Sequence, residues 1–175
     1  GTSAHASVIE WIDAELQDNG WDTQLQTFFW EGKEITNVIG RRGEGSPWIV
    51  IGAHYDSRFV ADRDASIEKK EQPVPGANDG ASGVAVLLEL ARVIPAYLDK
   101  QIWLVFFDAE DNGNLHGWEW SIGSSKFVEL LDGKPDAVVI LDMIGDENLN
   151  IYKEKNSNPT LTDEIWMQAS NLGYP

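Results

Sequence analysis

The sequence predicts an α/β fold in which a mainly parallel, mixed sheet is flanked by helices. Three apolar stretches of strand length, at residues 48–53, 101–107 and 137–141, have the continuous hydrophobic character of strands buried on both faces. Helical patterns at residues 80–97 and 121–131 separate these stretches. Strands that alternate with helices indicate βαβ units, and such units build parallel sheets.

The N-terminal elements precede this alternating part. Residues 3–19 have the apolar spacing of a helix, for which Ser7 and Glu10 form a candidate capping box and Gly20 a stop signal. Residues 21–30 and 34–41 then read as the two strands of a hairpin. The chain therefore enters its parallel strands through a helix and an antiparallel pair.

The remaining segments are more polar. Residues 58–75 form a long charged loop, and loops of this length in compact domains are often functional. After the last apolar strand, residues 148–153 predict a short strand. Residues 160–171 predict an amphipathic helix capped by Thr160 or Thr162. No repeat or interdomain linker interrupts the chain, so we expect a single domain over residues 1–175.

Composition excludes several functions. The formal net charge of −16 disfavours nucleic acid and anionic membrane surfaces as partners. The chain has no cysteine, which excludes disulfides, thiolate metal sites and a cysteine nucleophile. No apolar run approaches the roughly 20 residues that span a bilayer. The compartment stays open, with a secreted or periplasmic location among the options, and the oligomeric state is undetermined.

Four segments with imidazole or carboxylate groups follow strands or precede a helix. They are His54-Tyr55-Asp56, Gly76–Gly83, Asp108–Asp111 and Leu141–Gly145. In parallel sheets, ligands bind beyond the carboxyl ends of the strands. We therefore expect these groups to meet at one edge of the sheet and to form a metal site.

The donor atoms suit zinc, which accepts imidazole nitrogen and carboxylate oxygen. In this interpretation His54 and Asp142 bind one ion, Asp111 binds a second, and Asp79 bridges the two. A pair of ions about 3.5–4 Å apart would activate a shared water and polarise a carbonyl. Glu110 would act as general base. Asp56 would accept the other ring N–H of His54 and orient its imidazole.

Each segment alone has an ordinary structural explanation. His54 can be a half-buried histidine without a ligand, Asp79 a helix cap, and residues 108–111 a solvated acidic loop. Asp142 follows an apolar strand, where a simple exposed position is less typical. The metal-site hypothesis depends on all four segments together. His5 and His116 receive no functional role.

At these residues the chain resembles the zinc-dependent exopeptidases of the M28 aminopeptidase family and the related glutaminyl cyclases. His54-Tyr55-Asp56-Ser57 and Asn78–Gly83 carry the resemblance most specifically. It implies a three-layer zinc-exopeptidase-like fold, the ligand and base assignments above, two zinc ions per full-length chain, and a cis peptide bond between Asp79 and Gly80. The implied partner is a peptide substrate with a free N-terminus.

Two departures from the family pattern stand out. Glu110-Asp111 replaces the usual Glu-Glu, so one ligand is a methylene shorter. The family's last ligand is a histidine well beyond the Asp142-Met143 motif, and no histidine follows Asp142 here. We therefore expect a truncated version that binds one zinc or none and lacks the C-terminal part of the domain.

The resemblance leaves three functions open. The Asn78–Gly83 motif favours an aminopeptidase that cleaves N-terminal peptide bonds. The Trp118–Trp120 insert is similar to glutaminyl cyclases, which use a single zinc. A catalytically inactive binding domain of the same fold is the third alternative. The aminopeptidase is the preferred interpretation.

Overall fold

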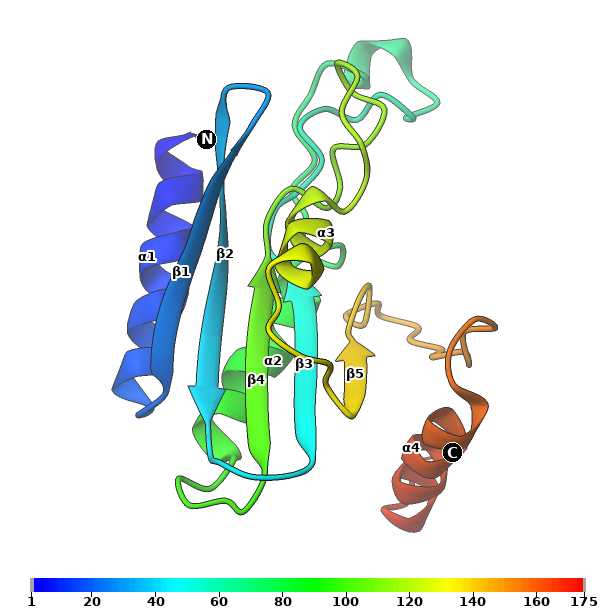
Figure 1. The fold of residues 1–175 in the computed structure, drawn as a ribbon. Helices are drawn as coiled ribbons and strands as arrows, with labels where there is room; N and C mark the ends of the chain where they lie inside the picture. The colour runs from blue at the N-terminus through cyan, green and yellow to red at the C-terminus, as the bar shows by residue number, and fades with distance from the viewer. Residues whose placement is uncertain (1, 175) are drawn as a thin grey trace.

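The computed structural model describes residues 2–174, and its centre is a five-stranded mixed sheet (Figure 1). The strand order is β1-β2-β4-β3-β5. The strands are β1 (Asp22–Trp30), β2 (Lys33–Arg42), β3 (Trp48–His54), β4 (Gln101–Phe107) and β5 (Ala137–Ile140). β3 pairs in parallel with β4 and β5, whereas β2 pairs antiparallel with β1 and β4. The predicted fold class is confirmed, with the parallel strands confined to one half of the sheet.

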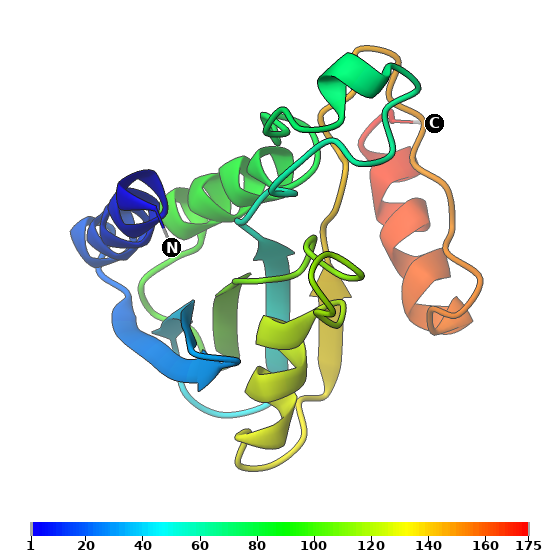
Figure 2. The same cartoon turned by 90° about the horizontal axis from the view of Figure 1, so that it is seen from above.

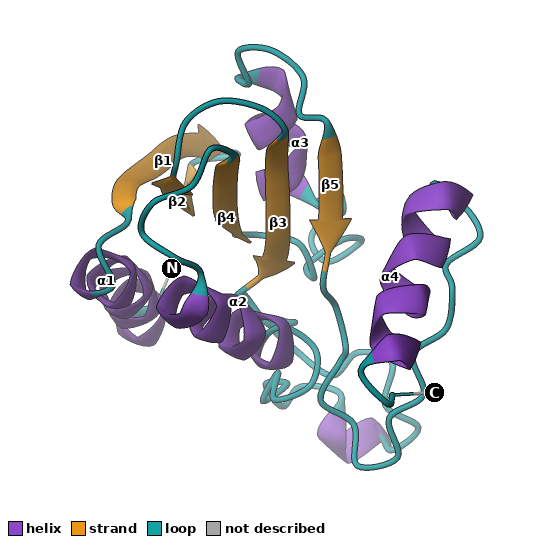
Figure 3. Cartoon of the chain, turned by 90° about the horizontal axis from the view of Figure 1, so that it is seen from below, coloured by secondary structure: helices purple, strands orange, loops and turns teal. Residues whose placement is uncertain are grey.

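Helices cover both faces of the sheet, which gives three layers. α1 (Ser3–Asp18) and α2 (Ala81–Val93) lie together on one face, and α3 (Ile122–Glu129) covers the other (Figures 2 and 3). α4 (Pro159–Asn171) stands beyond β5, apart from the other helices (Figure 2). A short 3₁₀ turn, η1 (Ile67–Lys69), lies within the long loop after β3.

Two apolar layers hold the helices on the sheet. Beneath α1 and α2 the core includes Leu16, Leu87 and Phe106, none of which is exposed. Beneath α3, Phe127 packs on Phe107 with ring centroids 5.6 Å apart, next to Val50 and Val105. At roughly 25 cal/mol per Å² of apolar surface, these layers are the main stabilising contribution to the fold. They fix the register of the strands and hence the positions of the residues that follow them.

β5 forms an edge of the described sheet. It pairs only with β3 within residues 2–174, and its Val138 and Ile140 side chains are 50% and 55% exposed. The burial pattern alternates along the strand, as expected for a strand with one face packed on the core.

Several local predictions were wrong. The strand predicted at residues 148–153 is irregular in the structure, since its side chains are exposed and no neighbouring strand pairs with it in the described chain. The cap of α1 is Thr2, whose side chain accepts the N–H of His5, and not Ser7. The cap of α4 is Asn158, whose side chain accepts the backbone N–H groups of Thr160 and Leu161. α2 ends at Val93, earlier than predicted, because Ile94 is extended before Pro95.

Candidate metal centre

The parallel strands bring the predicted site residues to one edge of the sheet. His54 is the last residue of β3 and pairs with Phe107, the last residue of β4, so the segment that follows β4 starts beside it. β5 ends at Ile140, two residues before Asp142. Asp79 lies just before α2 on the connection from β3. The expected convergence at the carboxyl ends of the strands is present.

His54, Asp79 and Asp142 form a group that can hold a metal ion. Each offers one ligand atom, and these atoms lie within 4.8 Å of one another. The Nε2 atom of His54 lies 3.0 Å from Asp79 Oδ1 and 3.4 Å from Asp142 Oδ1. Ligand atoms on a tetrahedral zinc lie roughly 3.3 Å apart, since Zn–N and Zn–O bonds are both about 2.0 Å. The spacing therefore fits a zinc ion between the three side chains.

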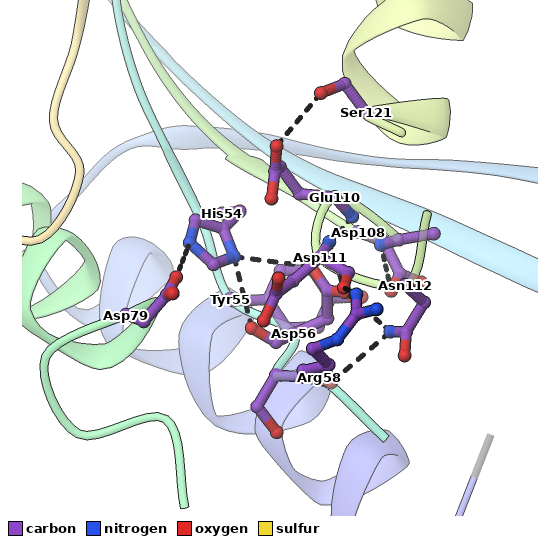
Figure 4. A network of polar contacts seen from close by, with 12 residues as sticks. His54, Tyr55, Asp56, Arg58, Asp79, Asp108, Glu110, Asp111, Asn112 and Ser121 are labelled. Carbon is purple, nitrogen blue, oxygen red and sulfur yellow. Dashed lines mark hydrogen bonds and ion pairs between the residues drawn. The ribbon is translucent and has the colours of Figure 1, made fainter. Parts of the chain in front are cut away.

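The hydrogen bonding of His54 supports the same interpretation. Its ring is buried, and Nε2 makes no hydrogen bond within residues 2–174, although both carboxylates lie near it. The other nitrogen, Nδ1, lies 3.1 Å from the backbone carbonyl of Asp56 and 3.5 Å from the Asp56 carboxylate (Figure 4). A proton on Nδ1 donated to this carbonyl leaves the lone pair of Nε2 directed at the carboxylates, as a metal ligand requires.

The acidic surroundings change the titration of His54. Burial lowers its pKa, but the Asp56 carboxylate, together with Asp142 and Glu110, outweighs burial and raises the pKa to about 9. The carboxylates thus stabilise positive charge at this point of the molecule. A divalent cation would place that charge there and would displace the proton.

Asp111 lies next to this group without belonging to it. Its side chain is buried, and its carboxylate is not among the three ligand atoms gathered at His54. Burial raises its pKa to about 6, and the charges of Asp79, Asp56 and Glu110 add to the effect. Several carboxylates that repel one another in this way are the arrangement that a second cation would relieve.

Glu110 extends over His54 from the other side of the site (Figure 4). Its Oε1 atom accepts a hydrogen bond of 2.9 Å from the hydroxyl of Ser121 at the start of α3. Burial raises the pKa of Glu110 despite this hydrogen bond. A half-buried carboxyl group held in a fixed orientation and with a raised pKa is suited to taking up and releasing a proton.

The backbone of residues 108–111 is fully hydrogen bonded. Side-chain oxygens accept all four N–H groups, and they belong to Asn37, Asp108 and Asp56, the last of which accepts two. The four carbonyls accept from the backbone N–H groups of Gly123, Ile122 and Ser121 and from the Arg58 guanidinium. Asp56 therefore does more than orient His54, because it also fixes the loop that carries Glu110.

Sequence reasoning missed four residues that support the site: His5, Asn37, Arg58 and Ser121. His5, to which no role was given, donates from Nε2 to the Asp108 carboxylate at 2.9 Å, and its ring lies near that of Tyr55. These residues are 11 to 103 positions from their partners, so no local pattern could reveal the contacts. His116 is exposed, as expected for a residue without a role.

The cis peptide bond suggested between Asp79 and Gly80 is absent. Among residues 2–174, the cis bond is Ser46–Pro47. Gly80 instead has a φ of 101°, a conformation that L side chains rarely adopt. An added Cβ would lie 2.8 Å from the Asp56 carbonyl oxygen, so glycine allows the chain to pass closely beneath His54.

None of the described helices combines the length and the apolar character needed to cross a lipid bilayer.

A model of a protein family matches most of the chain. The model described as "Peptidase family M28" matches residues 37–175, which include every predicted site residue. The chain belongs to peptidase family M28. The resemblance inferred from the sequence motifs is thereby confirmed.

The proteins similar to this chain include both peptidases and glutaminyl cyclases. Aminopeptidase YwaD of Bacillus subtilis is 35% identical over 142 residues, which cover 76% of this chain and 27% of that protein. The structure of Porphyromonas gingivalis glutaminyl cyclase superposes with a TM-score of 0.91 at 33% identity, over 99% of this chain and 66% of that one. A Zn-dependent exopeptidase from Parabacteroides distasonis superposes with a TM-score of 0.86 at 27% identity, with the same coverage.

The chain spans only part of these proteins. It covers 34%, 44% and 27% of the first curated relatives that it matches, and about two thirds of the solved structures above. The part shared with the two solved structures is 99% of this chain, so it contains the sheet and the candidate metal centre.

Proposed function

We propose that the protein containing this chain is a zinc-dependent aminopeptidase that hydrolyses the N-terminal peptide bond of its substrates. The observation that carries the proposal is the group of His54, Asp79 and Asp142, with an Nε2 atom free of hydrogen bonds in the described chain and a general-base candidate, Glu110, beside it. Membership of family M28 and the similarity to aminopeptidase YwaD support it.

Each residue has a defined task in this proposal. His54, Asp79 and Asp142 would hold one zinc ion, and Asp79 with Asp111 would contribute to a second. When bound, zinc supplies a Lewis acid that lowers the pKa of a water molecule and polarises a carbonyl. Glu110 would accept a proton from the attacking water and return it to the leaving amine. Asp56 would hold both His54 and the backbone of Glu110 in place.

The charge of the site suits the N-terminus of a peptide. The Asp142 and Asp79 side chains are 51% and 39% exposed, so part of each carboxylate faces solvent. A protonated α-amino group approaching this edge would meet acidic groups and the net charge of −16. Attraction of opposite charges would favour the amine end of a peptide over its carboxyl end.

A second candidate is a single-zinc glutaminyl-peptide cyclotransferase. The TM-score of 0.91 to P. gingivalis glutaminyl cyclase favours it, and so does the position of Asp111 outside the three-ligand group. In that reaction the substrate's own amine is the nucleophile, so the site would have to exclude water from attack. Glu110 would then move a proton from the amine to the departing ammonia.

One set of assays separates the candidates. The purified protein is analysed for zinc and incubated with a leucine-headed and a glutamine-headed peptide. Release of free leucine with two zinc ions per chain supports the aminopeptidase. Formation of pyroglutamate and ammonia with one zinc ion supports the cyclase. A protein without zinc and without either product would reject both and favour a binding domain.

A further inference from the structure

Arg58 joins the long loop after β3 to the loop that carries Glu110 and Asp111. Its guanidinium is buried and donates to the backbone carbonyls of Asp111 and Gly113. On its other side it forms two hydrogen bonds, of 2.6 and 3.0 Å, with the Asp62 carboxylate. The ring of Trp120 lies 5.1 Å from the guanidinium carbon. These contacts tie the two loops together beside Asp111.

Asp111 is therefore held by its backbone from two directions. The Asp56 carboxylate accepts its N–H at 3.2 Å, and Arg58 donates to its carbonyl. A short side chain such as aspartate has little reach, so the position of its carboxylate follows the position of its backbone. The two hydrogen bonds to the Asp111 backbone thus determine how close its carboxylate comes to Asp79.

We propose that Arg58 is a positioning residue that holds the Asp111 backbone so that its carboxylate reaches a zinc ion shared with Asp79. This inference rests on the proposed function, because it requires Asp111 to be a zinc ligand. Arg58 acts through the carbonyl of Asp111 and does not contact the ion.

The planar fork of arginine is essential to this role. One guanidinium reaches two carbonyls on one side and a carboxylate on the other, while its face packs on an indole ring. Lysine keeps the charge but offers a single ammonium group, which cannot span these partners in the same geometry. Loss of partners that orient metal ligands typically weakens metal binding by about 10- to 100-fold.

Zinc titration of the protein that contains this chain tests the proposal. Arg58→Met removes the fork, and Arg58→Lys retains the charge. Arg63→Met is the matched control, because Arg63 also lies over Trp120, at 5.3 Å, and makes no hydrogen bond to residues 110–114 in the described chain. The variants are made in the wild-type and the Asp111→Asn backgrounds, and each is checked by thermal unfolding.

We expect Arg58→Met to weaken binding of one zinc ion about tenfold or more, and Arg58→Lys to weaken it nearly as much. Arg63→Met should leave zinc affinity unchanged. In the Asp111→Asn background, Arg58→Met should have little further effect, because both changes remove the same ligand contribution. Arg58→Lys provides the same comparison if Arg58→Met does not fold.

Two results would overturn the inference. One is unchanged zinc affinity in both Arg58 variants, and the other is an equal loss in the wild-type and the Asp111→Asn backgrounds. If the wild-type protein binds two zinc ions in either case, the proposed function stands and only the role of Arg58 is rejected. A wild-type protein that binds no zinc would reject both.

Discussion

The Asp56 carboxylate holds Glu110 by its backbone: Asp56 Oδ1 accepts the N–H of Glu110 at 2.9 Å. The other oxygen accepts the N–H of Asp111 at 3.2 Å, and the backbone carbonyl of Asp56 faces His54 Nδ1. One buried residue therefore links the histidine of the metal group to the loop of the candidate base. This link explains why the two functional segments keep a fixed relation although more than 50 residues separate them.

Asp56→Asn should destabilise the protein and lower its activity. The amide replaces an oxygen acceptor with an NH₂ group, which cannot accept from a backbone N–H. A buried donor left unsatisfied costs about 1–3 kcal/mol, measurable by chemical denaturation. Asp99→Asn is the control, since Asp99 is an exposed surface residue that forms an ion pair with the neighbouring Lys100. Equal stability of the two variants would contradict the linking role of Asp56.

Glu110→Gln should abolish most turnover while leaving the fold and the zinc content intact. Glutamine retains the size of the side chain and can still accept from the Ser121 hydroxyl, but it cannot take a proton. The expected loss in kcat is about 10²- to 10⁴-fold, measured with the substrate that the wild-type protein converts. Turnover within tenfold of the wild type would show that another group is the base.

Zinc should stabilise the protein through His54. A ligand that binds only the folded state adds about 2.7 kcal/mol to the free energy of unfolding at a concentration 100 times its Kd. Thermal unfolding with excess zinc and with a chelator should therefore differ in the wild type, and the difference should shrink strongly in His54→Gln. His116→Gln is the control, because His116 is exposed and distant from the group in sequence. A zinc response as large in His54→Gln as in the wild type would place the stabilising ion elsewhere.

The sequence predicted the centre of the site because its residues follow a simple topological rule. His54 is the last residue of β3, Asp142 lies two residues after β5, and Asp79 lies two residues before α2, so strand order alone brings them together. The supporting residues follow no such rule. Asn37, for example, lies within β2 and reaches both Asp108 and Gly123 across the sheet. Such contacts depend on three-dimensional packing that no spacing along the chain encodes.

The same distinction explains the fold-level errors. Apolar strands and long amphipathic helices were predicted correctly, because burial of one face requires apolar residues at regular spacings along the sequence. Residues 148–153 alternate like a strand, but a strand also requires a neighbour with free backbone groups. Helix caps were misassigned because several hydroxyl and amide side chains near each helix start satisfy the same local pattern.

His5 should make stability depend on pH. The hydrogen bond to the Asp108 carboxylate raises the pKa of His5 above 6.5, although burial opposes it. Because the pKa is higher in the folded state, the contribution is fully present below pH 6.5 and is lost as the pH rises through the folded-state pKa. The wild type should therefore exceed His5→Gln in stability by about 1 kcal/mol at acidic pH, since glutamine offers only a neutral donor.

The measurement is the free energy of unfolding of both proteins at a series of pH values from about pH 5.5 to about pH 9, which starts below the ordinary imidazole pKa of about 6.5 and extends well above it. The difference between the proteins should shrink at the higher pH. Groups elsewhere titrate equally in both proteins and cancel in the comparison. A difference that grows with pH would mean that His5 is neutral when paired with Asp108.

Gly123→Ala should destabilise the protein even though it lies in a helix. Alanine usually favours a helix interior over glycine by about 1 kcal/mol. Here, however, the added Cβ would lie 2.1 Å from the Asp108 carbonyl oxygen and 2.5 Å from Asn37 Oδ1, which accepts the Asp108 N–H of the hydrogen-bonded 108–111 loop. The steric conflict should outweigh the helical preference and cost about 1–3 kcal/mol.

Ser125→Ala, at an exposed position of the same helix, provides the matched control and should be neutral or slightly stabilising. Denaturation of the two variants separates helix propensity from close packing. Because relief of the conflict must move either α3 or the loop that carries Glu110, Gly123→Ala should also reduce turnover more than Ser125→Ala does. A Gly123→Ala protein as stable and as active as the wild type would show that α3 can shift without disturbing Glu110, and that its close approach to Asp108 is not needed to position the base.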